Sequence, residues 1–232
     1  MLRKIYFDNA RQLLVRSLPA PVLKARRTAR DFEPDADLTR TIWQTTTPVY
    51  LEYESCDGTP RPELTTTVRA LWSHDFLNLR YECPFTKLTV FEPSQNSGKR
   101  YDTVREGVSL WDRDVVEAFI GADAQDVRHY GEFEVAPSNE HLDLMCHPTG
   151  KDFEWNSGFL SAVRVDKKAK VWVCELRIPI TALGGARPED GTRWRLNLFR
   201  CDRANKAALA WRPTLQDTFH APDRFGVLEF VE

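Results

Sequence analysis

The amino-acid sequence predicts an all-β protein, a single-domain antiparallel β-sandwich of about ten strands. Three observations lead to this fold class. Short segments alternate between apolar and polar residues with a period of two, which is typical of strands that are buried on one face. Clusters of Pro and Gly separate these segments, and few segments show a helical period. The chain has 232 residues, which suffices for one sizeable core.

Six segments alternate clearly enough to be assigned as strands. They lie at residues 64–72, 76–83, 159–165, 171–179, 192–200 and 224–231. A short polar segment joins the first two, and another joins the next two, so each pair is predicted to form a hairpin. Short helical turns are expected within residues 35–44 and 180–185. The tryptophans predicted to lie in the core are Trp43, Trp172, Trp194 and Trp211.

Residues 114–121 (DVVEAFIG) fit both a helix and a strand. Helical spacing places the apolar residues on one face, and Asp114 with Glu117 resembles a capping box. As a strand, the segment alternates, with Glu117 on the face away from the core. The later segment YGEFEVAP alternates in the same way and directs Glu132 and Glu134 outward. If the two segments pair as strands, Glu117 and one of these glutamates share a sheet face.

The charge balance and the hydropathy limit the possible partners. Lys and Arg number 32 and Asp and Glu 34, whereas proteins that bind nucleic acid usually carry a basic excess. No segment approaches the ~20 apolar residues of a membrane span, and none resembles the core of a signal peptide. We therefore expect a soluble protein without nucleic-acid partners. The sequence does not indicate its cellular compartment. The expected organisation is a basic leader at residues 1–21 and one domain at residues 22–232.

The sequence contains no recognisable catalytic or zinc-binding motif. The five cysteines include no CxxC pair, and the five histidines show no HExxH or HxH spacing. Glycoside hydrolysis needs two nearby carboxylates, which Glu117 with Glu132 or Glu134 would supply across a hairpin. A glycoside hydrolase with paired glutamates is therefore the catalytic alternative, although the prediction for this chain is a protein without enzyme activity.

Six segments occur in an order that resembles a known family. They are LWDRDVVEAFIGAD, YGEFEVAPSNEHLDL, CELRIPITALG, WRLNLFR, AWRPT and FHAPDRFGVLEF. Together they resemble the family 9 carbohydrate-binding modules, specifically the family-9-like proteins that stand as single domains. The resemblance runs from about Val22 to the C-terminus and includes LKARRTARDFEPDADLTRTIW, which is similar to the family's first strand. It implies a β-sandwich related to the DOMON superfamily, and it implies that residues 114–120 form a strand.

The resemblance also implies a ligand site. In the family, two aromatic rings clamp a sugar and polar side chains bind its hydroxyl groups. Trp111, just before the strand at 114–120, matches one ring, and Phe219 stands where better-known modules carry the second, a tryptophan. Glu117 and Gln216 match the polar positions.

Two further positions depart from the family pattern. Glu134 stands where the sugar-binding modules carry an arginine, and Phe199 where they carry a glutamine. Glu134 either binds a sugar hydroxyl or pairs with Arg195 or Arg200, and Phe199 shares the outer face of its strand and is expected to line the same cleft. Both residues therefore complete the predicted set of ligand-binding residues.

The function implied by the resemblance is non-catalytic carbohydrate binding in carbohydrate catabolism, by a monomer with a mono- or oligosaccharide ligand. The family often carries structural calcium, which prefers clustered carboxylates. Asp35 with Asp37 and Asp123 with Asp126 are the candidates, without a recognisable ligand spacing, and no other cofactor is expected. A protein-interaction or haem-type DOMON-like domain that has lost sugar binding is the non-catalytic alternative.

Overall fold

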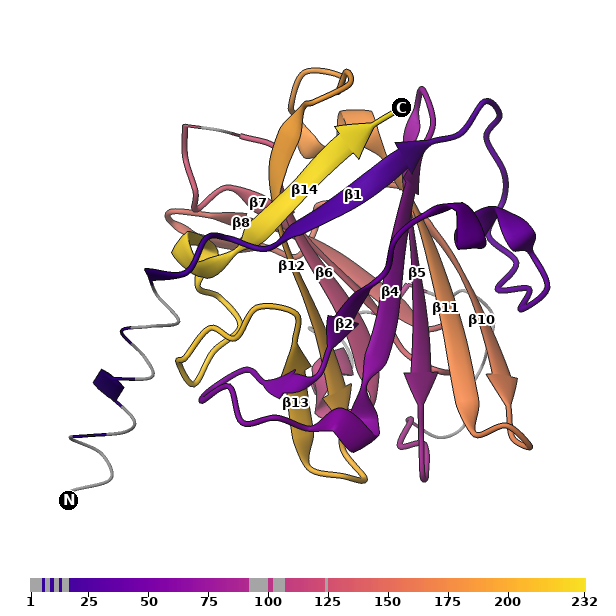
Figure 1. Cartoon of the computed structure of the whole chain (residues 1–232), viewed down its shortest axis with the longest axis vertical. Helices are drawn as coiled ribbons and strands as arrows, with labels where there is room; N and C mark the ends of the chain where they lie inside the picture. Colours follow the sequence, from indigo (N-terminus) through magenta and orange to yellow (C-terminus); the bar gives the residue numbers. More distant parts are fainter. Residues whose placement is uncertain are drawn as a thin grey trace.

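The described part of the chain folds into strands joined by turns and short 3₁₀ helices (Figure 1). The computed structural model describes residues 6, 9, 10, 13, 17–91, 100, 101, 107–123 and 125–232. The strands are β1 (Val22–Arg27), β2 (Val49–Leu51), β3 (Tyr53–Glu54), β4 (Thr66–Trp72), β5 (Phe76–Pro84), β6 (Val115–Gly121), β7 (Tyr130–Val135), β8 (His141–His147), β9 (Gly150–Asp152), β10 (Leu160–Asp166), β11 (Val171–Pro179), β12 (Arg193–Asp202), β13 (Ala207–Ala210) and β14 (Gly226–Val231). The 3₁₀ helices are η2 (Thr41–Thr45), η3 (Pro62–Leu64), η4 (Leu110–Asp112), η5 (Ile180–Leu183) and η6 (Pro222–Arg224).

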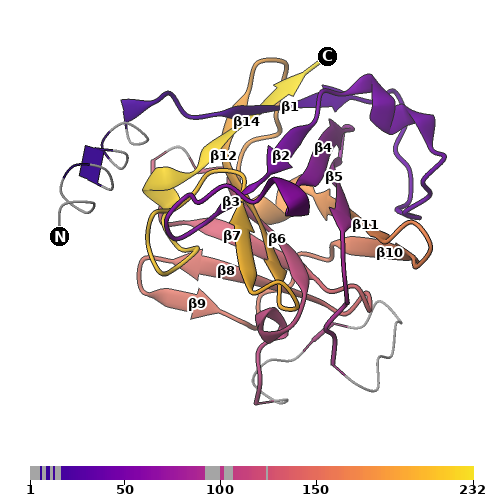
Figure 2. The same cartoon turned by 60° about the horizontal axis from the view of Figure 1, so that its bottom comes forward.

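The strands are hydrogen-bonded in the order β10-β11-β5-β4-β1-β14-β12-β6-β7-β8-β9, with β2 against β4 and with β13 between β12 and β3. The sheet folds back on itself, so that β4, β5 and β11 face β6, β7 and β12 as two layers (Figures 1 and 2). The predicted all-β sandwich is therefore confirmed. The number of strands exceeds the predicted ten because β2, β3, β9 and β13 have only two to four residues each. Such short strands leave no alternating pattern.

The main core lies between the two layers. Leu79 from β5 and Trp172 from β11 pack in the same cluster as Phe133 from β7 and Leu196 from β12, and all four are fully buried. The four tryptophans predicted to lie in the core are at most 8% exposed. Each layer thus buries the apolar side of its alternating strands, which is what the period of two requires.

The two predicted hairpins are present, as the antiparallel pairs β4–β5 and β10–β11. The ambiguous segment at 114–121 forms strand β6, as the family resemblance implies, and pairs with β7 and β12. The two predicted helical turns are the 3₁₀ helices η2 and η5. Tertiary pairing on both sides therefore decides the conformation of β6, which the local sequence leaves open.

Strand β1 joins the two layers. It pairs in parallel with β14, where Val22 is the partner of Val227, and in parallel with β4, where Arg26 is the partner of Leu71. These two parallel pairs differ from the predicted all-antiparallel arrangement. They arise because β1 runs along the edges of both layers and makes them one continuous sheet (Figure 1).

The outer face of β6, β7, β8 and β12 is covered as well. A second apolar cluster lies on this face and includes Phe119, Leu144, Phe199 and Phe225. Glu132 and Glu134 lie on the same face, and they are 2% and 0% exposed. The prediction that they point outward is correct for the sheet face, but wrong for their exposure. Alternation determines which face a side chain occupies, whereas η4 and the segment from β13 to β14 decide that this face is covered.

The N-terminal segment is only partly described. Most of the predicted basic leader at residues 1–21 lies outside the described residues. Strand β1 begins at Val22, the residue at which the predicted domain begins. Among the described residues, no helix is long and apolar enough to cross a membrane.

Candidate functional site

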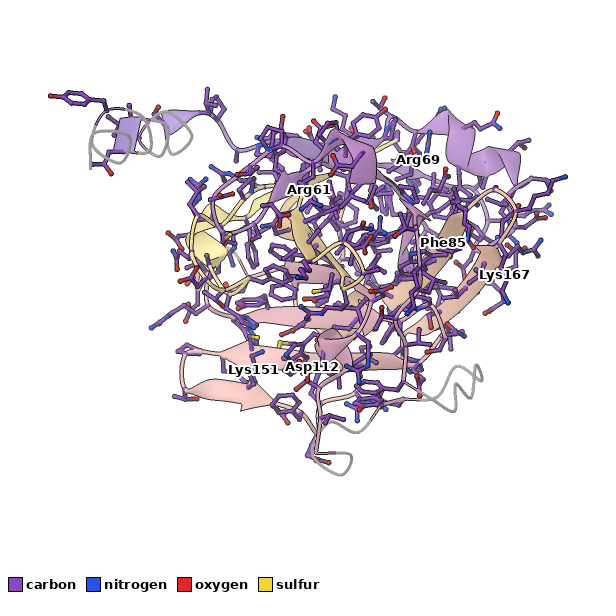
Figure 3. The ribbon with its side chains drawn as sticks, turned by 90° about the horizontal axis from the view of Figure 1, so that it is seen from below. Arg61, Arg69, Phe85, Asp112, Lys151 and Lys167 are labelled. Carbon is purple, nitrogen blue, oxygen red and sulfur yellow. The ribbon has the colours of Figure 1, made fainter. Side chains whose placement is uncertain are left out.

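A cleft of about 560 Å³ opens on the outer face of the β6–β7–β12 layer. Its floor is made by strand side chains, namely Glu117 and Phe119 from β6, Glu132 from β7 and Cys201 from β12. Its walls come from η4, strand β9, the segment that follows β3, and the long segment between β13 and β14. Figure 3, which labels Lys151 and Asp112, shows this side of the molecule. A rigid floor with walls made by loops is a common plan for ligand sites.

Trp111 forms one wall of the cleft from the short 3₁₀ helix η4. The Asp112 carboxylate accepts a hydrogen bond from the backbone N–H of Ser109 at 3.2 Å, and the Ser109 side chain completes a capping box. A helix of three residues has few internal hydrogen bonds, so this box supplies much of its order. The first acid after Trp111 therefore holds the tryptophan in position.

The second acid, Asp114, ties η4 to two other segments. It is 3% exposed and accepts hydrogen bonds from the backbone N–H groups of Thr89 and Arg203, each at 2.8 Å. A guanidinium N–H of Arg203 also donates to the carbonyl oxygen of Trp111. The half-buried Trp111 ring faces the cleft, and the Lys151 ammonium lies 5.4 Å from its centroid. The acids around Trp111 in the sequence therefore position its ring.

Phe219 forms a second aromatic wall of the cleft. Its ring stacks on Phe199, with the centroids 4.2 Å apart and the planes at 7°. Phe199 is fully buried on β12 and does not line the cleft, so it supports the wall from behind. The predicted role of Phe199 as a lining residue is therefore wrong. The stacked pair fixes the orientation of the outer ring before any ligand arrives.

The loop that carries Phe219 is held in an unusual backbone conformation. Leu215 has a φ of 59°, a left-handed conformation that is rare for a side chain of this size. Its backbone N–H donates to the Ser55 carbonyl at 2.9 Å. The Thr214 hydroxyl lies 2.8 Å from the carbonyl oxygen of Thr218. These contacts fix the loop between β13 and β14, and they leave the exposed Gln216 on the cleft.

Three glutamates meet beneath and beside the cleft floor. Glu117 and Glu134 are direct cross-strand partners, and each of the two offers a carboxylate oxygen within 4.8 Å of one from Glu132. All three are at most 2% exposed. Neither oxygen of Glu134 has a hydrogen-bond partner of ordinary geometry, and Glu134 itself does not line the cleft. The predicted sharing of one sheet face is confirmed, but Glu134 lies below the surface that a ligand would touch.

Burial controls the charge of this cluster. Burial, and next the nearby Glu132 carboxylate, raises the pKa of Glu117 to about 8. Burial, followed by Glu117 and Glu132, raises the pKa of Glu134 well above its ordinary value. The Lys151 ammonium lies 3.4 Å from Glu132 Oε2. At neutral pH, Glu117 therefore retains its proton, and the pKa of Glu134 is raised in the same direction.

The two arginines predicted as partners of Glu134 bind elsewhere. Arg200 pairs with Asp202 at 2.7 Å. Arg195 donates to the carbonyl oxygens of Asp123 and Asp126 at 2.7 and 3.1 Å. The predicted ion pair of Glu134 with either arginine is therefore wrong. Arg200 lies on the core-facing side of β12, opposite Val116, whereas Glu134 lies on the other side of the sheet with Glu117.

The structure brings together four of the six predicted site residues and adds others. Trp111, Glu117, Gln216 and Phe219 all line the cleft. Glu132, which the sequence analysis considered only as a catalytic partner of Glu117, also lines the cleft. Sequence reasoning missed several further lining residues, of which the charged and titratable ones are Lys151, Arg203, Asp217, His220 and the thiols of Cys56 and Cys201. Most of these lie in turns, where no alternation marks the direction of a side chain. The available signal was proximity in sequence for Asp217 and His220, which flank Phe219.

The aspartates considered for calcium are engaged in turns and ion pairs. Asp37 accepts from the backbone N–H of Thr39 at 2.9 Å, and Asp35 pairs with Arg40. Asp123 accepts from the backbone N–H groups at 125 and 126, while Asp126 pairs with Arg128 at 3.0 Å. Within the described ranges, the groups of three ligand-type side chains contain none of these aspartates. The carboxylates of both loops are therefore used in turn hydrogen bonds and ion pairs.

A β-sandwich with an aromatic-walled cleft on a rigid strand floor defines a small-ligand-binding domain. Comparison with known families identifies the family to which this domain belongs. Residues 35–232 match the model of the carbohydrate family 9 binding domain-like proteins, and the chain belongs to this family. This confirms the resemblance found in the six sequence segments.

Solved structures share the fold. A protein from Bacteroides uniformis aligns with a TM-score of 0.69 at 15% identity, over 91% of this chain and 99% of that one. A family 9 carbohydrate-binding module from Caldicellulosiruptor kristjanssonii aligns in its glucose complex with a TM-score of 0.61 at 14% identity, over 90% and 95% of the two chains. Its cellotriose complex aligns with a TM-score of 0.61 at 12% identity, over 91% and 94%.

A curated relative is closer in sequence. An extracellular protein of Arthroderma benhamiae is 26% identical over 193 residues, which is 75% of this chain and 82% of that protein. The similarity therefore extends over most of both chains.

Proposed function

We propose that the cleft binds a carbohydrate without catalysing a reaction, with Trp111 and Phe219 packed against the sugar ring. Glu117 and Gln216 bind its hydroxyl groups in this proposal. The observation that carries it is that these four side chains, from η4, β6 and the segment between β13 and β14, line one cleft. Membership of a family of carbohydrate-binding domains supports the ligand class.

The chemistry of the cleft suits a pyranose. The C–H faces of a sugar ring are apolar and pack on aromatic rings, whereas its hydroxyl groups need donors and acceptors. Glu117 keeps its proton at neutral pH because its pKa is about 8, so its carboxyl group both donates and accepts. Lys151 and Arg203 add donors at the rim. An open site of this size is expected to bind with a Kd of roughly micromolar to millimolar, or about −4 to −8 kcal/mol.

The two complexes of the Caldicellulosiruptor kristjanssonii module support a glucose-based ligand as the first one to test. In calorimetric titrations at pH 7 with a panel of mono- and disaccharides, we expect saturable binding of at least one sugar. Trp111→Ala and Phe219→Ala should each weaken this binding roughly ten-fold or more, because each removes one ring contact worth over 1 kcal/mol. Analysis of the sugar after the titration should show it intact.

Tyr50→Ala is the matched control for loss of a ring. Tyr50 is 47% exposed on β2 and lies outside the cleft, so binding should not change. Circular dichroism and melting temperatures would verify that all three variants fold. Absence of saturable binding at millimolar sugar would contradict the proposal and favour a protein-interaction domain. Cleavage of a disaccharide during the titration would instead favour a hydrolase that uses the paired glutamates.

A further inference from the structure

Three metal-ligating side chains of different chemistry converge at the inner wall of the cleft. Glu132 comes from β7, Cys146 from β8, and His220 from the loop before η6, and one ligand atom of each lies within 4.8 Å of the others. Cys146 Sγ and His220 Nε2 each lie 3.8 Å from the same oxygen, Glu132 Oε2. We propose that these three side chains bind a transition-metal ion, with Zn²⁺ as the expected occupant.

The set of donors indicates the kind of ion. Thiolate and imidazole ligands favour zinc and its first-row neighbours over calcium or magnesium. Three protein ligands leave one position of a tetrahedral ion open, and here that position would face the cleft, because Glu132 and His220 line it. Zinc bonds of about 2.0–2.3 Å place tetrahedral ligands roughly 3.3–3.7 Å apart. The two separations from Glu132 Oε2 therefore need to shorten by only a few tenths of an ångström, and Cys146 Sγ lies 4.0 Å from the His220 ring, at Nδ1.

A second layer of contacts orients the imidazole. The Tyr130 hydroxyl lies 2.8 Å from His220 Nδ1, and the His220 ring stacks on Phe119 with the centroids 5.1 Å apart. A metal at Nε2 requires the proton to be at Nδ1, where the Tyr130 oxygen accepts it. Hydrogen bonds of this kind to the second ring nitrogen are usual for metal-bound histidines. The contacts that orient the His220 imidazole for metal binding are therefore present before an ion binds.

Carboxyl oxygens surround the proposed ion, and one cation competes with it for Glu132. The carboxyl groups of Glu117 and Glu134 lie within 4.8 Å of the Glu132 carboxylate. The opposing charge is the Lys151 ammonium, 3.4 Å from Glu132 Oε2, which a metal ion would displace. The Lys151 side chain is 30% exposed, so it can turn toward water. Lys151→Met should therefore tighten metal binding several-fold, because it removes the competing cation.

No sequence spacing predicts this site. Glu132 and Cys146 are 14 residues apart, and Cys146 and His220 are 74 residues apart. The antiparallel pairing of β7 with β8 brings the first two together, because Cys146 lies opposite Tyr130, two residues before Glu132 on the same face. The loop that carries Phe219 then supplies His220. The absence of a zinc motif in the sequence is therefore compatible with a site assembled by the fold.

The test is a titration of the reduced, full-length protein with Co²⁺ in chelator-free buffer without sugar, followed by competition with Zn²⁺. We expect one Co²⁺ per chain with a sulfur-to-cobalt charge-transfer absorption in the near ultraviolet, and displacement by Zn²⁺. Cys146→Ser should abolish this absorption. His220→Gln should weaken binding at least ten-fold. The His220 side chain is partly exposed, so this variant should fold and can serve as the test if Cys146→Ser does not fold.

Cys56→Ser is the matched control, because Cys56 is an exposed thiol on another wall of the same cleft. Binding should be unchanged in this variant. Loss of the charge-transfer absorption in Cys56→Ser, but not in Cys146→Ser or His220→Gln, would overturn the proposal. Displacement of Co²⁺ by equimolar Ca²⁺ would also overturn it, because the glutamates alone would then be the ligands. The test contains no sugar, so its outcome is independent of the proposed carbohydrate binding.

Discussion

Arg200→Met is expected to lower the free energy of unfolding by about 3–5 kcal/mol, a loss typical of breaking a buried ion pair. The side chains of Arg200 and Asp202 are 2% and 1% exposed, and their charged groups lie 2.7 Å apart. The same guanidinium group donates to the Thr66 hydroxyl at 2.8 Å and to the Pro84 carbonyl at 2.5 Å. Its removal leaves the Asp202 carboxylate buried without its cation. Urea unfolding monitored by tryptophan fluorescence would measure the change.

Arg193→Met provides the control from the same strand. Its side chain is 58% exposed and pairs with Glu229 at 3.3 Å, and such surface pairs contribute under about 1 kcal/mol. The double variant Arg200→Met with Asp202→Asn should recover part of the loss, because it removes the stranded charge. Equal effects of the Arg200 and Arg193 substitutions would show that the buried pair is not needed for stability.

The second large effect concerns pH. We expect the free energy of unfolding to fall as the pH rises from about 6.5 to about 8, because Glu117 has a folded-state pKa of about 8 and that of Glu134 is raised as well. In this range the unfolded chain has released the Glu117 proton, whereas the folded protein retains it, and the raised pKa of Glu134 acts in the same direction. Unfolding therefore releases protons, and each such proton lowers the free energy of unfolding by roughly 1.4 kcal/mol per pH unit.

The lower limit of this window is set by histidines. Burial lowers the pKa of His141 and His220, so the folded state keeps them neutral. Their contribution to stability is lost on acidification below about 6.5, and it has the opposite sign to that of the glutamates. Between about 6.5 and 8 the unfolded chain does not bind protons at these histidines, so the glutamate contribution dominates there.

Glu134→Gln isolates the contribution of the cluster, since it removes one buried titrating group without touching the cleft surface. Urea unfolding at several pH values should give a shallower slope for this variant than for the wild type. Glu63→Gln is the control, because hydrogen bonding to Arg61 lowers the pKa of this exposed carboxyl and confines its effect to acid pH. Identical slopes for the wild type and Glu134→Gln would mean that the folded cluster is ionised.

The sequence contains most of the information about which face each strand residue occupies. Alternation correctly paired Glu117 with the glutamates of the next strand, and it placed Phe133 and Val135 on the core side. It did not reveal that loops cover the opposite face, and therefore misplaced Glu134 at the surface. Coverage depends on where distant segments pack, a tertiary property that no local period contains.

The aromatic residues and the polar residues of the site differ in how well they could be predicted. Trp111 and Phe219 could be predicted as site residues because each stands beside a strand that matches the family. Lys151, by contrast, lies on the three-residue strand β9 and reaches the cleft only because β9 pairs with β8 and β8 with β7. Sequence reasoning therefore identified the walls of the cleft better than the charges that surround its floor.

The pairing of β1 with β14 has a consequence for how the chain folds. Arg27 and Glu232, which form an ion pair near the ends of these strands, are 205 residues apart in the sequence. A ribosome must release almost the whole domain before β1 can pair with β14, so the sheet is completed only after synthesis of the last strand. Long-range pairings of this kind slow folding and leave strand edges exposed meanwhile. Nascent chains that stop before Gly226 should therefore be targets for chaperones and prone to aggregation.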